Sequence, residues 1–486
     1  MNRPSKRILA ALTLLLTVTG LAQAQTWTVI ELPATIDELP AAVEQQLGYP
    51  LDEVPDHNLT HIKFTGKDLR RTGISSSGYN YTNNRHQNMY KLVQKAKVLD
   101  LSELQYNEDN LNAPDEKFYT LHAIGSELDQ LQKMIYPKVA KRIDHNLRYC
   151  THLTEVVWPT AAITSLPDAM FGYCRSLKSV TLPDALTVIA GSLFNGCDSL
   201  QSVSIPAGVT DIGSDAFEYC GRLEQLILPE GLQSIGAEAF ERTALREVVV
   251  PNSVTTMGVG VFLECDSLRS VTLPRGLSDI PNNLFRSCDN LQDVDMPRAP
   301  RRIGEHAFDS DVSLHQLDIP EGVTEIAYQA FRYCYLSSVR LPGTLRTLRA
   351  GAFSDADWLK EIDIPASVQI IGESCFGSCD SLERVTLHEG LLSIKDNAFN
   401  DSPVLGNVEL PNSLRFMGRR VFCGNTRRTS FTLPPLLTEV PDYTCASCDS
   451  LETVILHDRC TRIGTCAFEI GDYWHPYNKL AHVTIP

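Results

Sequence analysis

The sequence predicts an α/β repeat solenoid of about 15 units of about 23 residues, with one parallel β-sheet and a return side of loops and short turns. Two ladders of residues and a strand pattern support this fold. Phenylalanines recur at intervals of 22 or 23 residues, at Phe171, Phe194, Phe217, Phe240, Phe262, Phe285, Phe308, Phe331, Phe353, Phe376, Phe399 and Phe422. Prolines recur with the same period, at Pro183, Pro206, Pro229, Pro251, Pro274, Pro297, Pro320, Pro342 and Pro365. A unit this short cannot bury its own apolar side, so it must stack on its copies.

Each unit is expected to begin with a short strand. In residues 199–220, apolar Val203 and Ile205 alternate with Ser202 and Ser204. Side chains of a strand point alternately to its two faces, so the apolar pair points inward and the serines outward. Pro206 ends the strand because proline cannot donate to a β-ladder.

The rest of the unit is expected to return to the start of the next strand. Val209 and Ile212 supply apolar contacts, and Ala216 and Phe217 fill the interior. Residues 214–220 leave room for one helical turn but not for the 10 to 12 residues of an independent helix. The return side should therefore consist of loops and single turns.

An N-terminal α+β cap is predicted over residues 25–130, because a solenoid needs a terminal unit whose outer face tolerates water. The segment lacks the ladders but contains patterns typical of strands at 27–32, 61–66 and 97–102, of helices at 36–47 and 88–93, and of a polar loop around 73–84. The repeat solenoid then occupies residues 131–486. A small enzymatic domain is the alternative for the cap, although three strands leave little room for one.

Residues 1–24 have the pattern of a secretory signal peptide. Basic residues come first, an apolar run follows over residues 8–21, and Ala22-Gln23-Ala24 forms a small-residue cleavage site. We expect cleavage after Ala24 and a secreted or cell-surface protein without a transmembrane segment in the mature chain. An uncleaved membrane anchor is the alternative, but the run is shorter than the roughly 20 residues that a span needs.

The charge balance is acidic. The chain has 59 Asp and Glu against 43 Lys and Arg, which gives a formal net charge of −16 at pH 7. Nucleic acid is therefore not an expected partner, because its phosphates favour basic surfaces.

Most of the 14 cysteines occupy one position of the repeat, at Cys150, Cys174, Cys197, Cys220, Cys265, Cys288, Cys334, Cys379 and Cys448. Other units have Thr243, Asp311 or Ser402 there, and these residues cannot form disulfides. Parallel side chains about 4.8 Å apart also lack the geometry of a disulfide. We therefore predict a ladder of buried thiols.

Cys445-Ala-Ser-Cys448 has the spacing of a redox or zinc pair. However, Cys445 takes the phenylalanine position of its unit and Cys448 belongs to the thiol ladder. No metal site and no cofactor is predicted.

The repeat, L-x-x-V-x-L-P followed by I-G-x-x-A-F-x-x-C-x-S-L, resembles the BspA-like leucine-rich repeats of bacterial surface proteins of the Treponema and Bacteroides type. Ile235-Gly236 with Ala239-Phe240 and Ile303-Gly304 with Ala307-Phe308 follow this pattern. Arg428 replaces the leading leucine of its unit, where we expect looser packing. The resemblance implies adhesion to host or neighbouring-cell components, through a protein ligand or an extracellular matrix component.

A candidate binding face lies in the outward columns of the sheet. Acidic residues gather in its central turns, where only a cation or a basic side chain would offset carboxylates about 5 Å apart. Calcium could take this role, and a solvated polar face is the alternative. The candidate residues are Asp293, Asp295, Asp318, Arg340, Glu361, Asp363, Arg384 and Glu409.

A candidate binding loop lies near the C-terminus, where the last unit is longer than the others and contains Tyr473, Trp474 and Tyr477. Exposed aromatic rings there could hold a sugar or a protein partner, or could simply cover the last unit. A glycan-binding accessory protein of surface polysaccharide handling is therefore an alternative function. No catalytic motif such as H-E-x-x-H or G-x-S-x-G occurs. We thus predict no enzyme, with a secreted enzyme using a degenerate site in the cap as a further alternative.

Overall fold

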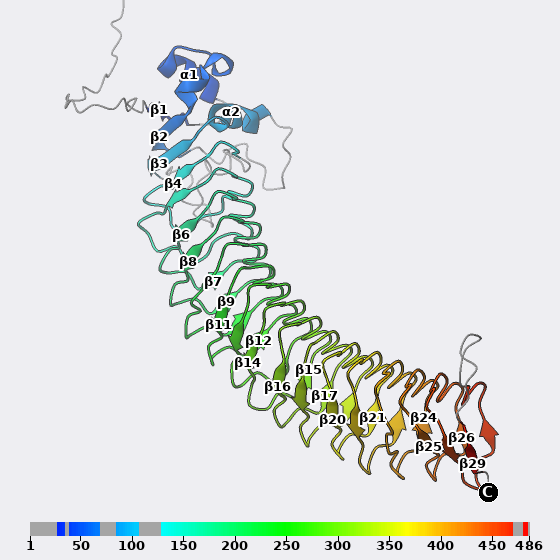
Figure 1. Ribbon diagram of the computed structural model, residues 1–486. Coiled ribbons are helices and arrows are strands. Elements are labelled where there is room, and N and C mark those ends of the chain that lie inside the picture. The colour runs from blue at the N-terminus through cyan, green and yellow to red at the C-terminus, as the bar shows by residue number, and fades with distance from the viewer. Residues whose placement is uncertain (1–26, 35–37, 69–83, 106–127, 470–479, 485–486) are drawn as a thin grey trace, which may run out of the picture.

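The computed structural model describes residues 27–34, 38–68, 84–105, 128–469 and 480–484. The chain forms one elongated, curved solenoid that begins at a helical N-terminal end and winds in similar turns toward the C-terminus (Figure 1). With about 14 turns of about 23 residues, it confirms the predicted repeat solenoid.

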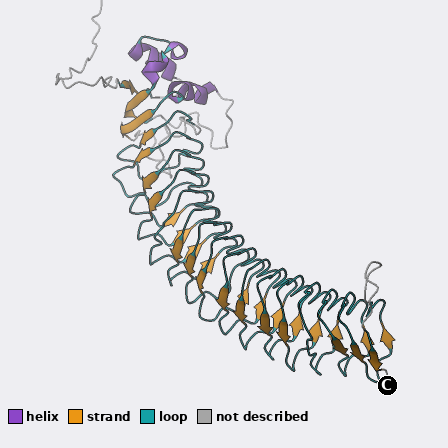
Figure 2. Ribbon diagram, viewed as in Figure 1, coloured by secondary structure: helices purple, strands orange, loops and turns teal. Residues whose placement is uncertain are grey.

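The N-terminal region contains the predicted strands and helices. Its strands are β1 (Thr28–Glu31), β2 (His61–Lys67) and β3 (Val98–Gln105). Its helices are α1 (Leu39–Leu47) and α2 (Asn84–Val93), with short 3-10 helices at Leu51–Glu53 and Asp56–Leu59. In the described residues all helices lie at this end (Figure 2). Most of the predicted polar loop lies outside the described residues.

The sheet of this region continues into the solenoid. Its five parallel strands run in the order β1-β2-β3-β4-β5, with β4 at Lys133–Ile135 and β5 at Glu155–Val157. Val98 of β3 pairs with Lys133 of β4. The helices lie at the end of this sheet, where Leu39 and Val43 of α1 are buried. This arrangement is what a cap requires, although the boundary near residue 130 stays a prediction.

One side of the solenoid carries a ladder of three-residue strands, which we call the first ladder. Their pairing is parallel and in register, as in Val271↔Val294, with the middle residue inward and the outer two toward solvent. This confirms the predicted strand and its orientation. The strands are β6 (Ser179–Thr181), β8 (Ser202–Ser204), β11 (Glu247–Val249), β13 (Ser270–Thr272), β14 (Asp293–Asp295), β16 (Gln316–Asp318), β18 (Ser338–Arg340), β20 (Glu361–Asp363), β22 (Arg384–Thr386), β25 (Ser430–Thr432), β27 (Thr453–Ile455) and β29 (His482–Thr484).

A second ladder lies on the return side, where the sequence predicted loops and single turns. Its two-residue strands also pair in parallel, as in Ile326↔Leu348. Segments this short show no alternation, but stacking in register aligns their N–H and C=O groups so that they pair. They are β7 (Val188–Ile189), β9 (Asp211–Ile212), β10 (Ser234–Ile235), β12 (Thr256–Met257), β15 (Arg302–Ile303), β17 (Glu325–Ile326), β19 (Thr347–Leu348), β21 (Ile370–Ile371), β23 (Ser393–Ile394), β24 (Phe416–Met417), β26 (Glu439–Val440) and β28 (Arg462–Ile463).

The repeat phenylalanines form one buried stack from Phe171 to Phe422. Neighbouring ring centroids are 5.1–5.7 Å apart. The backbone around each ring is unusual, as Asp215 and Tyr219 on either side of Phe217 have φ of 55° and 59°. The Phe217 N–H donates to Ala239 O of the next turn at 2.8 Å. Hydrogen bonds between turns therefore hold a left-handed conformation that few non-glycine residues adopt.

The cysteine ladder is buried beside this stack, as predicted, and all 14 cysteines are free thiols. From Cys197 onward each ladder thiol donates to the phenylalanine carbonyl of the preceding turn, for example Cys197 Sγ to Phe171 O and Cys288 Sγ to Phe262 O, both at 3.0 Å, while Cys174 Sγ donates to Leu147 O. Ser402 Oγ makes the equivalent bond to Phe376 O. Burial raises the pKa of the thiols, that of Cys265 to about 11, so they stay protonated donors at neutral pH.

Candidate functional site

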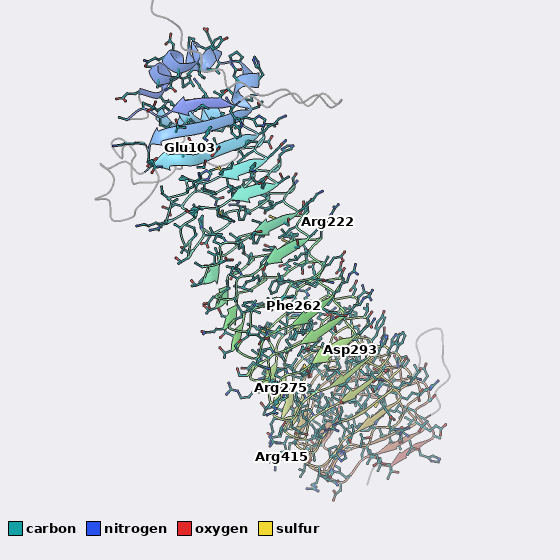
Figure 3. All side chains as sticks on the ribbon, turned by 90° about the vertical axis from the view of Figure 1, so that its left-hand side faces the viewer. Glu103, Arg222, Phe262, Arg275, Asp293 and Arg415 are labelled. Carbon is teal, nitrogen blue, oxygen red and sulfur yellow. The ribbon has the colours of Figure 1, made fainter. Side chains whose placement is uncertain are left out.

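All eight residues of the predicted binding face are exposed on the first ladder or on the turn that continues it. Figure 3 looks onto the solenoid from this side and labels Asp293 next to a strand of the ladder. Asp293 and Asp295 belong to β14, Asp318 to β16, Arg340 to β18, Glu361 and Asp363 to β20, and Arg384 to β22, while Glu409 lies in a turn without a strand. The structure thus brings the predicted residues onto one surface.

Four of these carboxylates have no partner among the described residues: Glu409, and three others that lie on consecutive turns. The side chains of Asp293, Asp295 and Asp318, which we call the unpaired carboxylates, form no hydrogen bond and no ion pair there. Arg340 is the register partner of Asp318, yet no ion pair within 4.0 Å joins them. Asp295 and Asp318 occupy the same position of consecutive turns, and the strands that carry them, β14 and β16, are not paired with each other.

Two acidic residues closer to the C-terminus, Glu361 and Asp363, have partners within the face. Arg384 Nη1 lies 3.4 Å from Glu361 Oε2, and His388 Nε2 lies 2.7 Å from Asp363 Oδ1. Both pairs are exposed, so each contributes little to stability. The face therefore divides into an unpaired acidic part at β14–β16 and a mixed-charge part at β20–β22.

A calcium site on this face gains no support. In the parts of the chain that the structure describes, no group of three or more His, Cys, Asp or Glu side chains is placed to hold a metal ion. Calcium needs six to eight oxygen ligands, and two aspartates on one strand with a third on the next turn supply few of them.

Three aromatic residues beside the acidic part were missed by the sequence analysis. His315, Tyr335 and Trp358 precede β16, β18 and β20, and the Trp358 ring lies 5.3 Å from the His315 ring and 5.4 Å from the Tyr335 ring. The signal was available, because Trp358 replaces the serine that precedes the leading leucine in units such as Ser199-Leu200 and Ser267-Leu268.

The Cys445–Cys448 pair lies in the interior next to a buried arginine. Arg428, only 1% exposed, places its guanidinium 3.9 Å from the centre of the Phe422 ring. It occupies the side of the Phe422 ring on which the next phenylalanine would stack if Cys445 did not replace it, and its Nε and Nη1 have no hydrogen-bond partner within the described residues. The looser packing expected at Arg428 stays a prediction. Burial opposes ionisation of Cys445, but the Cys448 thiol and the Arg428 charge outweigh it and lower the pKa of Cys445. Both thiols are buried away from any reactant, which favours a structural role.

An open hollow lies between the N-terminal region and the first turns, where a cap enzyme would need its site. It has a volume of about 640 Å³ and is lined by Asp56, His57, Thr60, Tyr90, Gln94, Lys95, Lys97, Asp129 and Gln130. Within the described residues no carboxylate bonds the His57 ring, and Lys95 and Asp56 form an exposed pair at 3.8 Å. Covalent catalysis requires a nucleophile within hydrogen-bond reach of a base that a third group orients, and the described lining residues of the hollow form no such arrangement.

Two predictions fall outside the described residues. The signal peptide and its cleavage after Ala24 lie within residues 1–26, and the candidate loop with Tyr473, Trp474 and Tyr477 lies within residues 470–479. Among the helices that are described, none is long and apolar enough to cross a membrane.

Comparisons with known proteins point to one family. The BspA type leucine rich repeat region matches residues 141–266, 233–359 and 347–472. A leucine-rich repeat protein of Bacteroides ovatus is 26% identical, with a TM-score of 0.51 over 63% of this chain and 80% of that chain. A leucine-rich repeat protein of T. pallidum is 30% identical over 35% of this chain and 71% of that chain (TM-score 0.29). A leucine rich cell surface protein of Faecalibacterium prausnitzii is 22% identical over 72% and 93% (TM-score 0.39). No curated protein matches the chain.

Proposed function

Because the chain belongs to the BspA-type leucine-rich repeat family, we propose that it is a non-catalytic binding protein, secreted or displayed at the cell surface, that captures a protein partner in adhesion. The matched repeats span most of the solenoid, and repeat proteins of this kind bind partners along extended surfaces. The partner belongs to the host or to a neighbouring cell, as a soluble protein or a matrix component.

The unpaired carboxylates are the observation that carries this proposal. Asp293, Asp295 and Asp318 are exposed on consecutive turns and have no partner in the described part of the chain. Elsewhere on the same ladder, Glu361 and Asp363 have basic partners. Like charges held close together are unfavourable until a cation offsets them. A partner with lysine or arginine side chains on its surface would do so, and it would also be attracted over a distance by the acidic protein.

The test uses the mature protein against a panel of host extracellular proteins of differing net charge and a glycan array. We expect capture of basic proteins, weakening as salt rises from about 50 to about 500 mM and unchanged by a chelator, because direct charge pairing is screened by salt. The triple change Asp293→Asn, Asp295→Asn, Asp318→Asn should abolish this capture.

A matched control removes the same charge elsewhere. Glu373, Asp449 and Asp458 are exposed carboxylates outside the outward columns of the first ladder, and changing them to Gln, Asn and Asn should leave capture intact. Equal losses in the two triple variants would mean that only net charge matters, which contradicts a binding face at β14–β16. Binding to glycans alone would instead favour the polysaccharide-handling alternative.

A further inference from the structure

An exposed aromatic stack lies at the edge of the first ladder. The planes of His315 and Tyr335 are within 6° and 7° of the Trp358 plane, so the three rings are nearly parallel. Unlike the buried phenylalanine stack, this group faces water, since Trp358 is 49% exposed and His315 is exposed as well. We call these three residues the aromatic platform.

The platform is held in place before any partner arrives. His315 Nδ1 lies 3.2 Å from Tyr335 O, which links the imidazole to the backbone of the next turn. His315 directly precedes β16, while Tyr335 and Trp358 lie three positions before the first residues of β18 and β20. Rings that are already ordered lose little conformational entropy when they bind, and tryptophan and tyrosine are the residues most often found at energetic centres of interfaces.

Other aromatic rings of this solenoid already hold a guanidinium group. Arg332 lies over Tyr333 at 4.3 Å, Arg242 over Tyr219 at 4.9 Å and Arg420 over Tyr443 at 4.8 Å from the ring centre. Among the described residues no lysine or arginine lies over Trp358. The indole, the best ring for a cation, is thus left without one.

Carboxylates follow two of the platform residues along the chain. Asp318 of β16 is three residues after His315, and Glu361 of β20 is three residues after Trp358. A basic segment could place one side chain on the indole and others on these carboxylates. A guanidinium, being planar and weakly hydrated, stacks on an aromatic face better than an ammonium does.

We propose that the aromatic platform binds an arginine side chain of the basic partner, with Trp358 as its main contact. This inference rests on the proposed function, because it adds an anchor to the acidic face. It goes further in stating that the partner presents arginine rather than lysine at this point of the surface.

The test compares nona-arginine with nona-lysine by calorimetry on the mature protein. The wild type should bind nona-arginine at least about threefold more tightly. Trp358→Ala should lower the affinity for nona-arginine roughly three- to tenfold, as expected for a partly exposed cation–π contact. It should change the affinity for nona-lysine by less than about twofold. Tyr328→Ala is the control, since this ring is 44% exposed beside the second ladder, and it should change neither affinity.

The triple Asp→Asn variant separates the two proposals, because loss of charge should weaken both peptides alike. If the triple variant loses both peptides while Trp358→Ala binds nona-arginine as the wild type does, the platform inference is overturned and the acidic face stands. If neither variant differs from wild type, both proposals fail. If Trp358→Ala abolishes binding of a neutral oligosaccharide and leaves binding of both peptides unchanged, the arginine assignment is also overturned and the platform is a sugar site.

Discussion

The inward side chains of successive turns are nearly identical, whereas the outward side chains of the same turns vary. Inside, Phe285, Phe308 and Phe331 repeat one ring with nearly constant spacing. Outside, the residues on those turns change from aspartate to arginine within three strands, as at Asp295, Asp318 and Arg340. Stacking requires every interior side chain to fit its copies, while solvent places no such demand on the surface. The interior therefore fixes the fold, and the outward columns are free to specify a partner.

The largest effect is expected for a break in the interior. Phe285→Ala removes a fully buried ring that stacks on Phe262 and Phe308 at 5.7 and 5.3 Å. The cavity should lower the free energy of unfolding by about 3 to 5 kcal/mol. Denaturant unfolding measures the loss. A loss below about 1 kcal/mol would mean that the stack is not what holds neighbouring turns together.

The turn with Arg428 tests whether the usual interior leucine and phenylalanine of the repeat can be restored. Cys445→Phe alone should clash with the buried guanidinium and cost about 1 to 3 kcal/mol. Arg428→Leu together with Cys445→Phe recreates the usual turn and should stabilise the protein by about 1 to 4 kcal/mol, since a buried charge is replaced by apolar packing. A double-mutant cycle measures the coupling. Additive effects would show that Arg428 does not occupy the place of the missing ring.

Asp311 is a second interior residue that departs from the repeat, and it should make the stability of the protein depend on pH. It takes a thiol position, its Oδ1 accepts the Cys288 N–H at 2.9 Å, and its Oδ2 has no partner. Burial raises the pKa of this carboxyl well above its usual range, with Asp309 and Asp289 adding to the shift. The unfolded chain then releases a proton that the folded chain keeps. Stability should therefore fall, by up to about 1.4 kcal/mol per pH unit, as pH rises above the unfolded pKa near about 4.

Asp311→Cys restores the ladder thiol and should remove this component of the pH dependence. Glu241, whose pKa burial and the neighbouring Glu218 charge raise to about 7, is present in both proteins, so its own contribution cancels. The unfolding midpoints of wild type and Asp311→Cys should be measured from about pH 4 to about pH 8, since this range begins at the unfolded pKa of aspartate. Parallel curves for Asp311→Cys and wild type would show that Asp311 is already ionised in the folded protein.

The smallest effect is expected for a neutral change on the outward side. Ser270→Ala lies on β13, one turn before β14, and its side chain points away from the interior. We expect a change in unfolding free energy below about 0.5 kcal/mol. Denaturant curves run beside those of Phe285→Ala provide the check, and similar losses at the two positions would reverse the assignment of inward and outward sides.

The sequence was sufficient to predict what repetition encodes. The period, the inward position of Val203, the buried thiols and the exposure of Asp293 all follow from in-register stacking. The second ladder could not be predicted, because two residues such as Asp211–Ile212 carry no alternation and pair only once the turns are stacked. The place of Arg428 beside the Phe422 ring could not be predicted, because a single sequence does not reveal that Cys445 of the following turn makes room for it. The His388–Asp363 contact depends on side-chain directions between turns, which no spacing rule supplies. Trp358 departs visibly from the repeat serine, but its stacking on His315 and Tyr335 also depends on these directions.

One measurement tests most directly whether fold and binding are divided between the two sides. The unfolding midpoint and the affinity for nona-arginine should be determined on the same preparation of the Asp293→Asn, Asp295→Asn, Asp318→Asn variant. We predict a midpoint equal to or slightly above that of the wild type, because like charges on neighbouring turns are removed, together with loss of salt-sensitive binding. A clearly lower midpoint, or unchanged binding with an unchanged midpoint, would contradict the account.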